Sequence, residues 1–309
     1  MFLLFASIAS LILLVLAARF VIAEVDVLSR ALHSSRFGLS FLLLGFLTSL
    51  TEIAVAINAQ ADGHPEIYAG NLIGGAFVIL LLIIPFLAIL KRGLPLQKHL
   101  PPSTLFLFCG LMGLPVLVAL DGMIGVADSI ALILAYAAFV FATLMKSGAS
   151  FNISVVFTKK VGISFIKICL ASVAIFASCH YLVLGTEELA AILGFPAFVV
   201  SIILLALGTN IPELSLAIAS IVKKKADVAL GDYVGSASLN ALILGGFSLM
   251  NGPYSLGITK YQTVLYIFLL SLLIFLVAAY TKKRISLYEA MALIACYGAI
   301  LAFQAFMHF

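Results

Sequence analysis

Charged residues are scarce in this 309-residue chain, at 10% of the total, whereas hydrophobic residues reach 64%. A soluble domain of this length does not tolerate so few charges, so that class of protein is excluded. A helix of about 20 apolar residues crosses a bilayer, and such stretches recur from end to end. The predicted spans are about 2–23, 39–61, 66–90, 103–120, 126–145, 163–184, 196–222, 227–250, 262–280 and 287–307. Since the connectors leave no room for a soluble domain, the sequence predicts an all-α integral membrane protein with ten transmembrane helices.

The chain also lacks the signatures of thiol, zinc and hydrolytic chemistry. Its cysteines are Cys109, Cys169, Cys179 and Cys296. All four fall inside apolar spans and form no C-x-x-C pair, so we expect small buried residues rather than disulfides or metal ligands. No H-E-x-x-H occurs, which makes an intramembrane enzyme the least favoured class. His64 and His180 are expected to be loop or helix-end residues.

No basic stretch precedes the first apolar segment, and Arg19 lies at its end. We therefore expect a retained first helix with its N-terminus outside, rather than a signal peptide.

Basic residues are almost absent from every second connector, and this bias predicts the topology. The loops after odd-numbered spans hold Arg30, Arg36, Lys91, Arg92, Lys98, Lys146, Lys159, Lys160, Lys223, Lys224, Lys225, Lys282, Lys283 and Arg284. The loops after even-numbered spans hold Lys260 and the acids Asp62, Glu66, Asp121, Asp128, Glu187 and Glu188. The positive-inside rule places the odd loops in the cytoplasm and both termini outside. The small basic excess reports orientation and is no evidence for nucleic-acid binding.

An internal repeat lies at the centre of the chain's organisation. Residues 47–76 (LTSLTEIAVAINAQADGHPEIYAGNLIGGA) align without a gap to residues 208–237 (GTNIPELSLAIASIVKKKADVALGDYVGSA), at one constant offset (213 − 52 = 161). The shared positions are Thr48 and Thr209, Glu52 and Glu213, Gly70 and Gly231, and Gly74 and Gly235. A shared glutamate and two shared glycines at fixed spacing indicate a true repeat.

Each half of the chain contains five predicted helices, which is an odd number. The second half therefore enters the membrane from the opposite side, which is the inverted-repeat plan of many transporters. We expect a first repeat over residues 1–145, a cytoplasmic linker over 146–162 and a second repeat over 163–309.

The two repeated glutamates are predicted to reach the same depth in the membrane. Each lies nine residues from the nearer end of its span (61 − 52 and 222 − 213), or about 14 Å at the helical rise. That is about half of a hydrocarbon core roughly 30 Å thick. The lysines and arginines lie at helix ends and in loops, so Glu52 and Glu213 must be protonated, bind cations, or alternate between those states.

The neighbouring residues indicate which cation suits the site. Hydroxyl and amide oxygens, without histidine or cysteine, favour calcium, sodium or magnesium over zinc or copper. Pro212 is predicted to open the helix at Gly208–Pro212 and expose carbonyl oxygens. The glycines of the repeats are predicted to let the third and eighth helices pack closely on the second and seventh.

At these residues the chain resembles the cation/calcium exchanger superfamily, which includes sodium/calcium and proton/calcium antiporters. GTNIPEL at 208–214 is similar to the family's G-T-S-x-P-E-L, and GDYVGSASLN at 231–240 to its G-N-x-x-G-S-N-x-x-[ND]. The resemblance implies that helices 2, 3, 7 and 8 enclose the ions while helices 1 and 6 slide to alternate access. By position it implies ion-site residues Glu52, Glu213, Thr48, Ser49, Thr209, Asn210, Ser236 and Asn240. Gly75 and Ile79 stand where the family has polar ligands, and Asp232 replaces an asparagine and either joins the site or begins a helix near the cytoplasmic mouth.

The predicted function is a secondary antiporter of the cell membrane that moves calcium, or a similar divalent cation, in exchange for sodium or protons. The alternative is a non-transporting membrane scaffold on the same fold. No cofactor is expected beyond the transported Ca²⁺, Na⁺ or H⁺. The expected partners are inorganic cations and the lipid bilayer, and the oligomeric state is left open.

Overall fold

The structure is a computed structural model that describes residues 2–31, 46, 49–96, 102–147, 159–222, 226–258 and 261–307. Each predicted span contains one helix or a series of helices. The unbroken helices are α1 (Phe2–Ala31), α4 (Leu50–Asp62), α7 (Pro102–Val118), α8 (Val126–Ser147), α9 (Lys159–Leu193), α13 (Ala226–Asn251), α14 (Gln262–Thr281) and α15 (Leu287–Met307). The third span is α5 (Pro65–Val78), the π-helix η2 (Ile79–Ile83) and α6 (Ile84–Leu90). The seventh is α10 (Ala197–Val200), the π-helix η3 (Ser201–Leu205), α11 (Ala206–Thr209) and α12 (Ile211–Val222).

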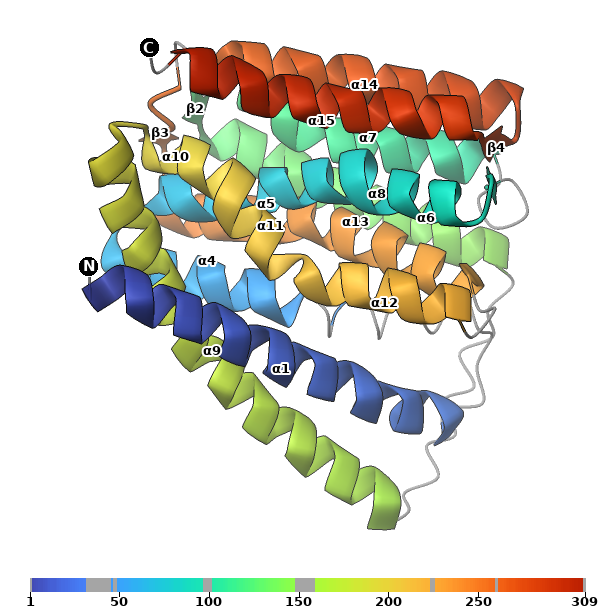
Figure 1. The fold of residues 1–309 in the computed structure, drawn as a ribbon, viewed down its shortest axis with the longest axis horizontal. Helices are drawn as coiled ribbons and strands as arrows, with labels where there is room; N and C mark the ends of the chain where they lie inside the picture. The colour runs from blue at the N-terminus through green and yellow to red at the C-terminus, as the bar shows by residue number, and fades with distance from the viewer. Residues whose placement is uncertain are drawn as a thin grey trace.

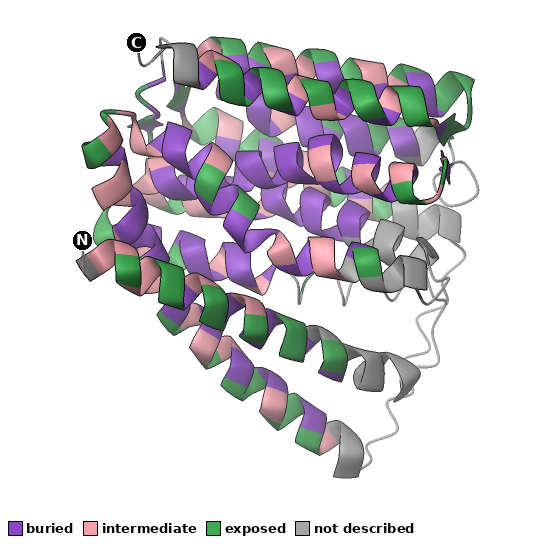
Figure 2. Cartoon of the chain, in the orientation of Figure 1, coloured by how far each residue is buried: buried purple, intermediate pink, exposed green. Residues whose placement is uncertain are grey.

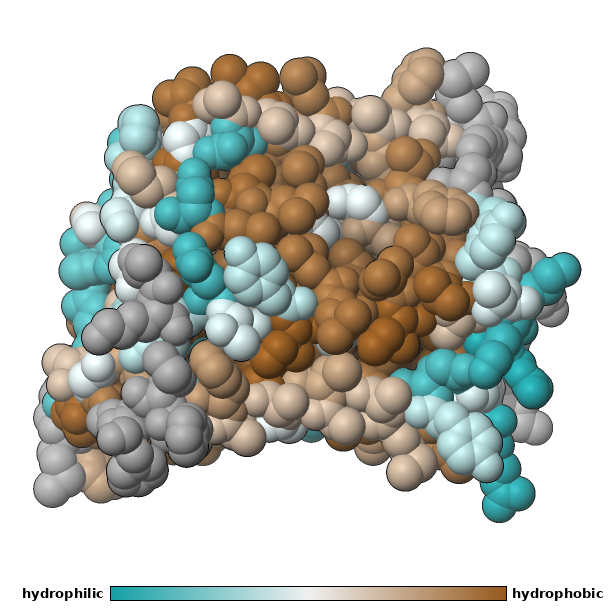
Figure 3. All heavy atoms as spheres, turned by 90° about the horizontal axis from the view of Figure 1, so that it is seen from above, coloured by the Kyte–Doolittle hydropathy of each residue, from teal (hydrophilic) through white to brown (hydrophobic). Residues whose placement is uncertain are grey.

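The described helices have the length and composition of a multi-pass membrane protein. Seven of them are long and apolar enough to cross a bilayer, and Leu105–Val118 and Val126–Ala142 are shorter apolar segments. A broad apolar belt covers the face seen in Figure 3, with hydrophilic residues gathered at its two margins. Large side chains such as Phe5, Leu134 and Leu170 are exposed on the outside of the bundle. An apolar exterior of this kind is stable in lipid and not in water.

The repeat extends through the whole described chain. Val126, the first residue of α8, is followed 161 residues later by Leu287, the first residue of α15. Pro65 and Ala226, which begin α5 and α13, have the same separation. The starts of α4 and α12, at Leu50 and Ile211, repeat it again. The 161-residue offset of the motif is therefore the offset of the fold.

Two short strand pairs lie at opposite ends of the bundle (Figure 1). The antiparallel pairs join β1 (Leu94–Pro95) to β4 (Arg284–Ile285) and β2 (Met123–Ile124) to β3 (Tyr254–Ser255). The repeat relates β2 to β4 at an offset of 161 and β1 to β3 at 160, so it exchanges one pair for the other. The two halves are thus inverted and each pair contains one strand from each half. The start of α1 and the end of α15 lie at the same end of the bundle (Figure 1).

The third span forms the centre of the bundle. Its apolar window, Pro65–Leu90, is 83% buried, and Figure 2 shows α5 almost continuously buried. Gly70 and Gly74 allow the approach of the seventh span, because a Cβ at Gly74 would lie 2.3 Å from the Ile202 carbonyl oxygen. The prediction of close glycine-mediated packing is confirmed for the third helix on the seventh.

A tight turn joins α4 to α5. Gly63 adopts a left-handed conformation (φ 80°), and the amide of His64 donates to the Ala59 carbonyl at 2.8 Å, which closes the end of α4. Pro65 then occupies the first position of α5, where its missing N–H costs nothing. This geometry fixes His64 between the two helices, in a turn as predicted.

The pair formed by α1 and α9 runs obliquely along one side of the bundle (Figure 1). Both helices are longer than predicted, since α1 continues to Ala31 and α9 to Leu193. The prediction that His180 lies at a helix end is therefore wrong: it lies well inside α9. The extra length arises from polar residues such as Glu187 that hydropathy alone assigns to a loop.

The seventh span is broken beside Pro212. The helix stops at Thr209 and restarts at Ile211, with Asn210 as the residue between. This confirms the predicted break in that turn. The two π-helical segments were not predicted, because a single wide turn leaves no mark in hydrophobic periodicity.

Candidate functional site

Two buried carboxylates lie at the starts of two short helices. Glu52 is in the first turn of α4 and Glu213 in the first turn of α12, and both are fully buried. A helix N-terminus carries a partial positive charge from its free N–H groups, which reduces the cost of burying an anion. Because α12 begins at the break after Asn210, the break itself positions Glu213.

Polar contacts connect α4, α13 and α5 around these helix starts. The Ser49 hydroxyl, at the start of α4, donates to the Ser236 hydroxyl of α13 at 3.2 Å. One helical turn further along α13, the Asn240 amide donates to the Leu72 carbonyl of α5 at 3.3 Å. All three of the polar side chains are buried.

The ring of contacts closes between α5 and the broken seventh span. The Thr209 hydroxyl donates to the Asn71 side-chain oxygen at 3.1 Å. A Cβ at Gly75 would lie 2.9 Å from Nδ2 of Asn240 and 3.3 Å from Nδ2 of Asn210. The two amides therefore converge on Gly75 and occupy the volume that a side chain there would need. Residues from four helical elements enclose one polar region in an otherwise apolar interior.

Several oxygens of this region accept no hydrogen bond from the described residues. They are Oε1 of Glu52, Oδ1 of Asn210 and Oδ1 of Asn240. The second carboxylate oxygen of Glu52 does have a donor, the Thr51 hydroxyl at 2.6 Å. Buried acceptors without donors are costly, and a cation, a proton or water would satisfy them.

The basic side chains inside the spans are engaged elsewhere. Lys167 pairs with Glu24 at 2.7 Å between α9 and α1. Arg19 of α1 donates to the Ser215 hydroxyl of α12 through Nε at 3.2 Å and Nη2 at 3.0 Å. Both contacts join the oblique pair to itself or to α12.

The structure brings most of the predicted site residues together in this region. Those that are described and buried are Ser49, Glu52, Thr209, Asn210, Glu213, Ser236 and Asn240. Thr48 and the side chain of Asp232 lie outside the described residues. Gly75 faces the region as an empty position, and Ile79 is buried without contributing an oxygen.

Sequence reasoning missed two polar neighbours. Thr51 bonds directly to Glu52, and Asn71 accepts from Thr209. A signal for Asn71 was present, because the offset of the repeat (232 − 71 = 161) pairs it with Asp232. Thr51 is paired with Pro212 by the same offset and was considered only for its effect on the helix break.

The sequence matches a known family over nearly its whole length. The sequence profile of the family described as sodium/calcium exchanger protein matches residues 2–145 and again residues 163–306. The uncharacterized membrane protein MJ0091 of Methanocaldococcus jannaschii is 24% identical over 285 residues, 88% of each chain. The sodium/calcium exchanger MaX1 of Methanosarcina acetivorans is 29% identical over 120 residues, which are 39% of this chain and 34% of that protein. The match thus spans about a third of MaX1.

Two groups of solved structures share the fold. A structure of the sodium-calcium exchanger NCX_Mj, soaked with Na⁺ and Sr²⁺, superimposes with a TM-score of 0.70 at 18% identity, covering 97% of this chain and 98% of that one. The H⁺/Ca²⁺ exchanger CAX gives a TM-score of 0.70 at 19% identity, covering 97% of this chain and 80% of that one. Identities this low indicate a common architecture and leave the site to be argued from its own residues.

Proposed function

The chain belongs to the sodium/calcium exchanger protein family, and from that premise we propose that it is a secondary antiporter that moves calcium, or a similar divalent cation, across the membrane in exchange for sodium or protons. Access to the buried site alternates between the two sides. Membership in an exchanger family makes the protein a transporter rather than an enzyme. The non-transporting scaffold is not favoured, because the polar region in its interior has no structural role that would offset its cost.

One observation carries the proposal: three buried acceptor oxygens from three elements lack donors among the described residues. They belong to Glu52, Asn210 and Asn240. Hard oxygens of carboxylates and amides are the ligands that calcium and sodium prefer. A transported ion is therefore the group that completes the site.

The two carboxylates provide the charge balance. Glu52 and Glu213 together carry two negative charges when ionised, which neutralise one divalent cation in the low-dielectric interior. Two protons, or monovalent cations, neutralise the same pair on the return. The neutral ligands in our proposal are Thr48, Ser49, Thr209, Asn210, Ser236 and Asn240, with Asp232 as a further carboxylate and Asn71 added from its contact with Thr209.

Sodium coupling and proton coupling are both compatible with this donor set. Relatives in fold include a sodium-calcium exchanger and an H⁺/Ca²⁺ exchanger. Gly75 and Ile79 supply no side-chain oxygen, which reduces the number of ligands available to additional sodium ions. The driving ion is a matter for the transport experiment below.

The proposed arrangement in the cell follows the charge distribution. We place the protein in the cell membrane with both termini outside, a first repeat over 1–145, a cytoplasmic linker over 146–162 and a second repeat over 163–309. The basic residues Lys91 and Arg92 precede β1, and Lys282, Lys283 and Arg284 accompany β4. Pairing of β1 with β4 gathers them at one end of the bundle, which is the cytoplasmic end by the positive-inside rule.

The test is calcium-45 uptake into proteoliposomes by the wild type, Glu52→Gln and Glu213→Gln. Glutamine keeps the shape of the side chain but cannot ionise, so both variants should fall to the level of empty liposomes. Asp121→Asn, at an exposed carboxylate outside the site, is the matched control and should keep wild-type uptake. Wild-type uptake equal to that of empty liposomes would exclude the transporter.

The same vesicles identify the driving ion. Uptake that follows an imposed sodium gradient at constant pH assigns sodium coupling. Uptake that follows a pH gradient and ignores sodium assigns proton coupling.

A further inference from the structure

The oblique pair α1–α9 covers the polar region and is loosely held. The apolar window of α1 is 28% buried and that of α9 is 44% buried, against 83% for Pro65–Leu90. The thiol of Cys179 in α9 lies 3.6 Å from the Thr51 carbonyl, next to Glu52. Since the glutamates are fully buried, an ion reaches them only when a covering element moves, and this pair is the least buried cover.

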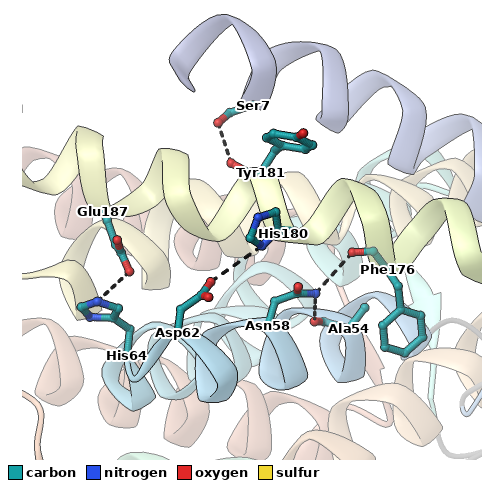
Figure 4. Close-up of polar contacts among 9 residues, drawn as sticks. All are labelled: Ser7, Ala54, Asn58, Asp62, His64, Phe176, His180, Tyr181 and Glu187. Atoms are coloured by element: carbon teal, nitrogen blue, oxygen red, sulfur yellow. Dashed lines mark hydrogen bonds and ion pairs between the residues drawn. The ribbon is translucent and has the colours of Figure 1, made fainter. Parts of the chain in front are cut away.

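A row of polar contacts fastens α9 to α4 and to the α4–α5 turn (Figure 4). Nε2 of His64 lies 2.9 Å from Oε1 of Glu187 in α9. Nδ1 of His180 in α9 lies 3.8 Å from Oδ2 of Asp62. These contacts, with Glu66 at the start of α5, form what we call the histidine seam: Asp62, His64, Glu66, His180 and Glu187.

Both ring nitrogens of His64 face carboxylates. Nδ1 lies 3.0 Å from Oε1 of Glu66, and Nε2 faces Glu187. A neutral imidazole carries one N–H and donates to only one carboxylate, whereas the imidazolium donates to both. The geometry of His64 is therefore that of the protonated ring. The contact between His180 and Asp62, at 3.8 Å, also gains its attraction only when the imidazole is charged.

The surroundings of the seam are mainly acidic. Asp62, Glu66 and Glu187 face the histidines, and Glu188 follows in α9. Beyond Glu66 lie the buried phenols of Tyr68 and Tyr254, whose rings are 5.9 Å apart. The seam thus combines carboxylates on both sides of a helix boundary with two rings that change charge between about pH 5 and pH 8.

We propose that His64 and His180 are positioning residues that form a proton-operated latch between α9 and the α4–α5 turn. When both rings are protonated, the latch holds the oblique pair against the bundle at this end and slows access to the site. When they lose their protons, one hydrogen bond and the charge attraction are lost and the pair is released. The effect on transport rests on the proposed antiport function, while the latch itself is a property of the helix contact.

The first experiment measures the pH profile of calcium-45 uptake with the pH varied on the side of the seam. Wild-type uptake should fall about tenfold from pH 8 to pH 5.5, the effect of one charge-assisted hydrogen bond on an opening equilibrium. In the double variant His64→Gln/His180→Gln the rate should lose most of this fall, because glutamine does not titrate. A double variant with the wild-type ratio of rates would overturn the proposal.

Asn58→Ala is the control for simple loosening of the helix contact. The Asn58 amide donates to the Phe176 carbonyl of α9 at 3.3 Å (Figure 4), so its removal weakens the same boundary without removing a titrating group. This variant should change the rate equally at both pH values and keep the wild-type ratio. A flattened profile in Asn58→Ala would assign the pH effect to loosening and contradict the latch.

A second readout does not depend on transport. Spin labels at cysteines replacing Ile192 in α9 and Met123 in β2, both exposed, report the distance between α9 and the bundle in a background without the native cysteines. The distance distribution should be narrow at pH 5.5 and broader at pH 8, and independent of pH in the double histidine variant. This experiment tests the latch even if calcium uptake is absent, and a pH-independent distribution in the otherwise wild-type protein would overturn it.

Discussion

Gly74 determines how closely the central helix approaches the broken one. A Cβ at this position would lie 2.3 Å from the Ile202 carbonyl oxygen and 2.6 Å from Cβ of Ala206. Both are too close for any real contact, and both neighbours are held by helices that cannot move independently. The hydrogen bond between Thr209 and Asn71 depends on this approach, so a hydrogen atom at Gly74 is a condition for the geometry of the site.

Gly74→Ala should lower the stability of the protein, because overpacking of this kind costs about 1–3 kcal/mol. Gly246→Ala is the control: among the described residues, no atom lies within 4 Å of the Cβ it would add. Alanine is the better helix former by about 1 kcal/mol, so the control should be neutral or stabilised. Thermal unfolding in detergent, followed by size-exclusion chromatography, measures both. An equal melting temperature for Gly74→Ala and wild type would contradict the close approach.

Individual residues differ in how far the sequence predicts them. Glu52 and Glu213 could be identified because charge is rare in apolar helices and because the repeat marks both. Asn71 and Thr51 carry no such mark, since amides and hydroxyls are common in membrane helices and bury themselves by bonding to neighbours. Their importance lies in a partner on the same or another helix, which a linear pattern does not show.

At the scale of elements, α1 and α9 behave as one unit joined at both ends. Near one end the Ser7 hydroxyl lies 2.8 Å from the Tyr181 carbonyl, and a Cβ at Gly185 would contact the Ser7 side chain. Near the other end Glu24 accepts from Lys167 at 2.7 Å and from the Ser164 hydroxyl at 2.7 Å. A pair fastened in this way moves together against the bundle.

Lys167→Met should destabilise this pair by between about 0.5 and 3 kcal/mol, the range from an exposed ion pair to a buried one. The carboxylate of Glu24 is mostly buried and the lysine is half exposed, so an intermediate value is expected. The double variant Glu24→Gln/Lys167→Met should recover part of the loss, because no charge is then left without its counterion. Thermal unfolding of the three variants gives the coupling, and strictly additive losses would show that the pair contributes nothing.

At the scale of the whole molecule, the inverted repeat explains why two carboxylates meet. Helices α4 and α12 begin 161 residues apart, and the strand pairs at the two ends exchange under the same relation. Two segments that enter from opposite sides reach the same depth when each is broken or begins at the midplane. The site therefore results from symmetry and not from a single continuous motif.

The predicted topology can be tested with symmetry-related positions. Met123 in β2 and Arg284 in β4 are exposed and 161 residues apart. In a background without the native cysteines, a membrane-impermeant maleimide added to intact cells should label Met123→Cys and not Arg284→Cys. Inside-out vesicles should give the reverse, and the cysteine-free parent should not be labelled in either. Labelling of both positions from one side would contradict the inverted arrangement.

The architecture could be predicted because its signals are linear. Hydropathy locates the spans, the distribution of lysine and arginine orders them, and the Pro212 break follows from the missing N–H of one residue. The lengths of α1 and α9 were underestimated, since hydropathy assigns polar residues such as Glu187 to loops even where the helix continues. The π-helical turns at 79–83 and 201–205 were missed because one additional residue per turn barely changes the apolar pattern.

The amino-acid sequence by itself determined that this is a polytopic membrane protein with a twofold repeat and a glutamate at the middle of each half, because the solvation of apolar and charged groups depends on residue type and spacing alone. Only the tertiary structure decided which atoms surround those glutamates and which histidines bind across the α9 boundary. The contact of Thr209 with Asn71 joins residues 138 positions apart, and two groups so distant in the chain become neighbours only when the packing of the helices sets their distance and direction.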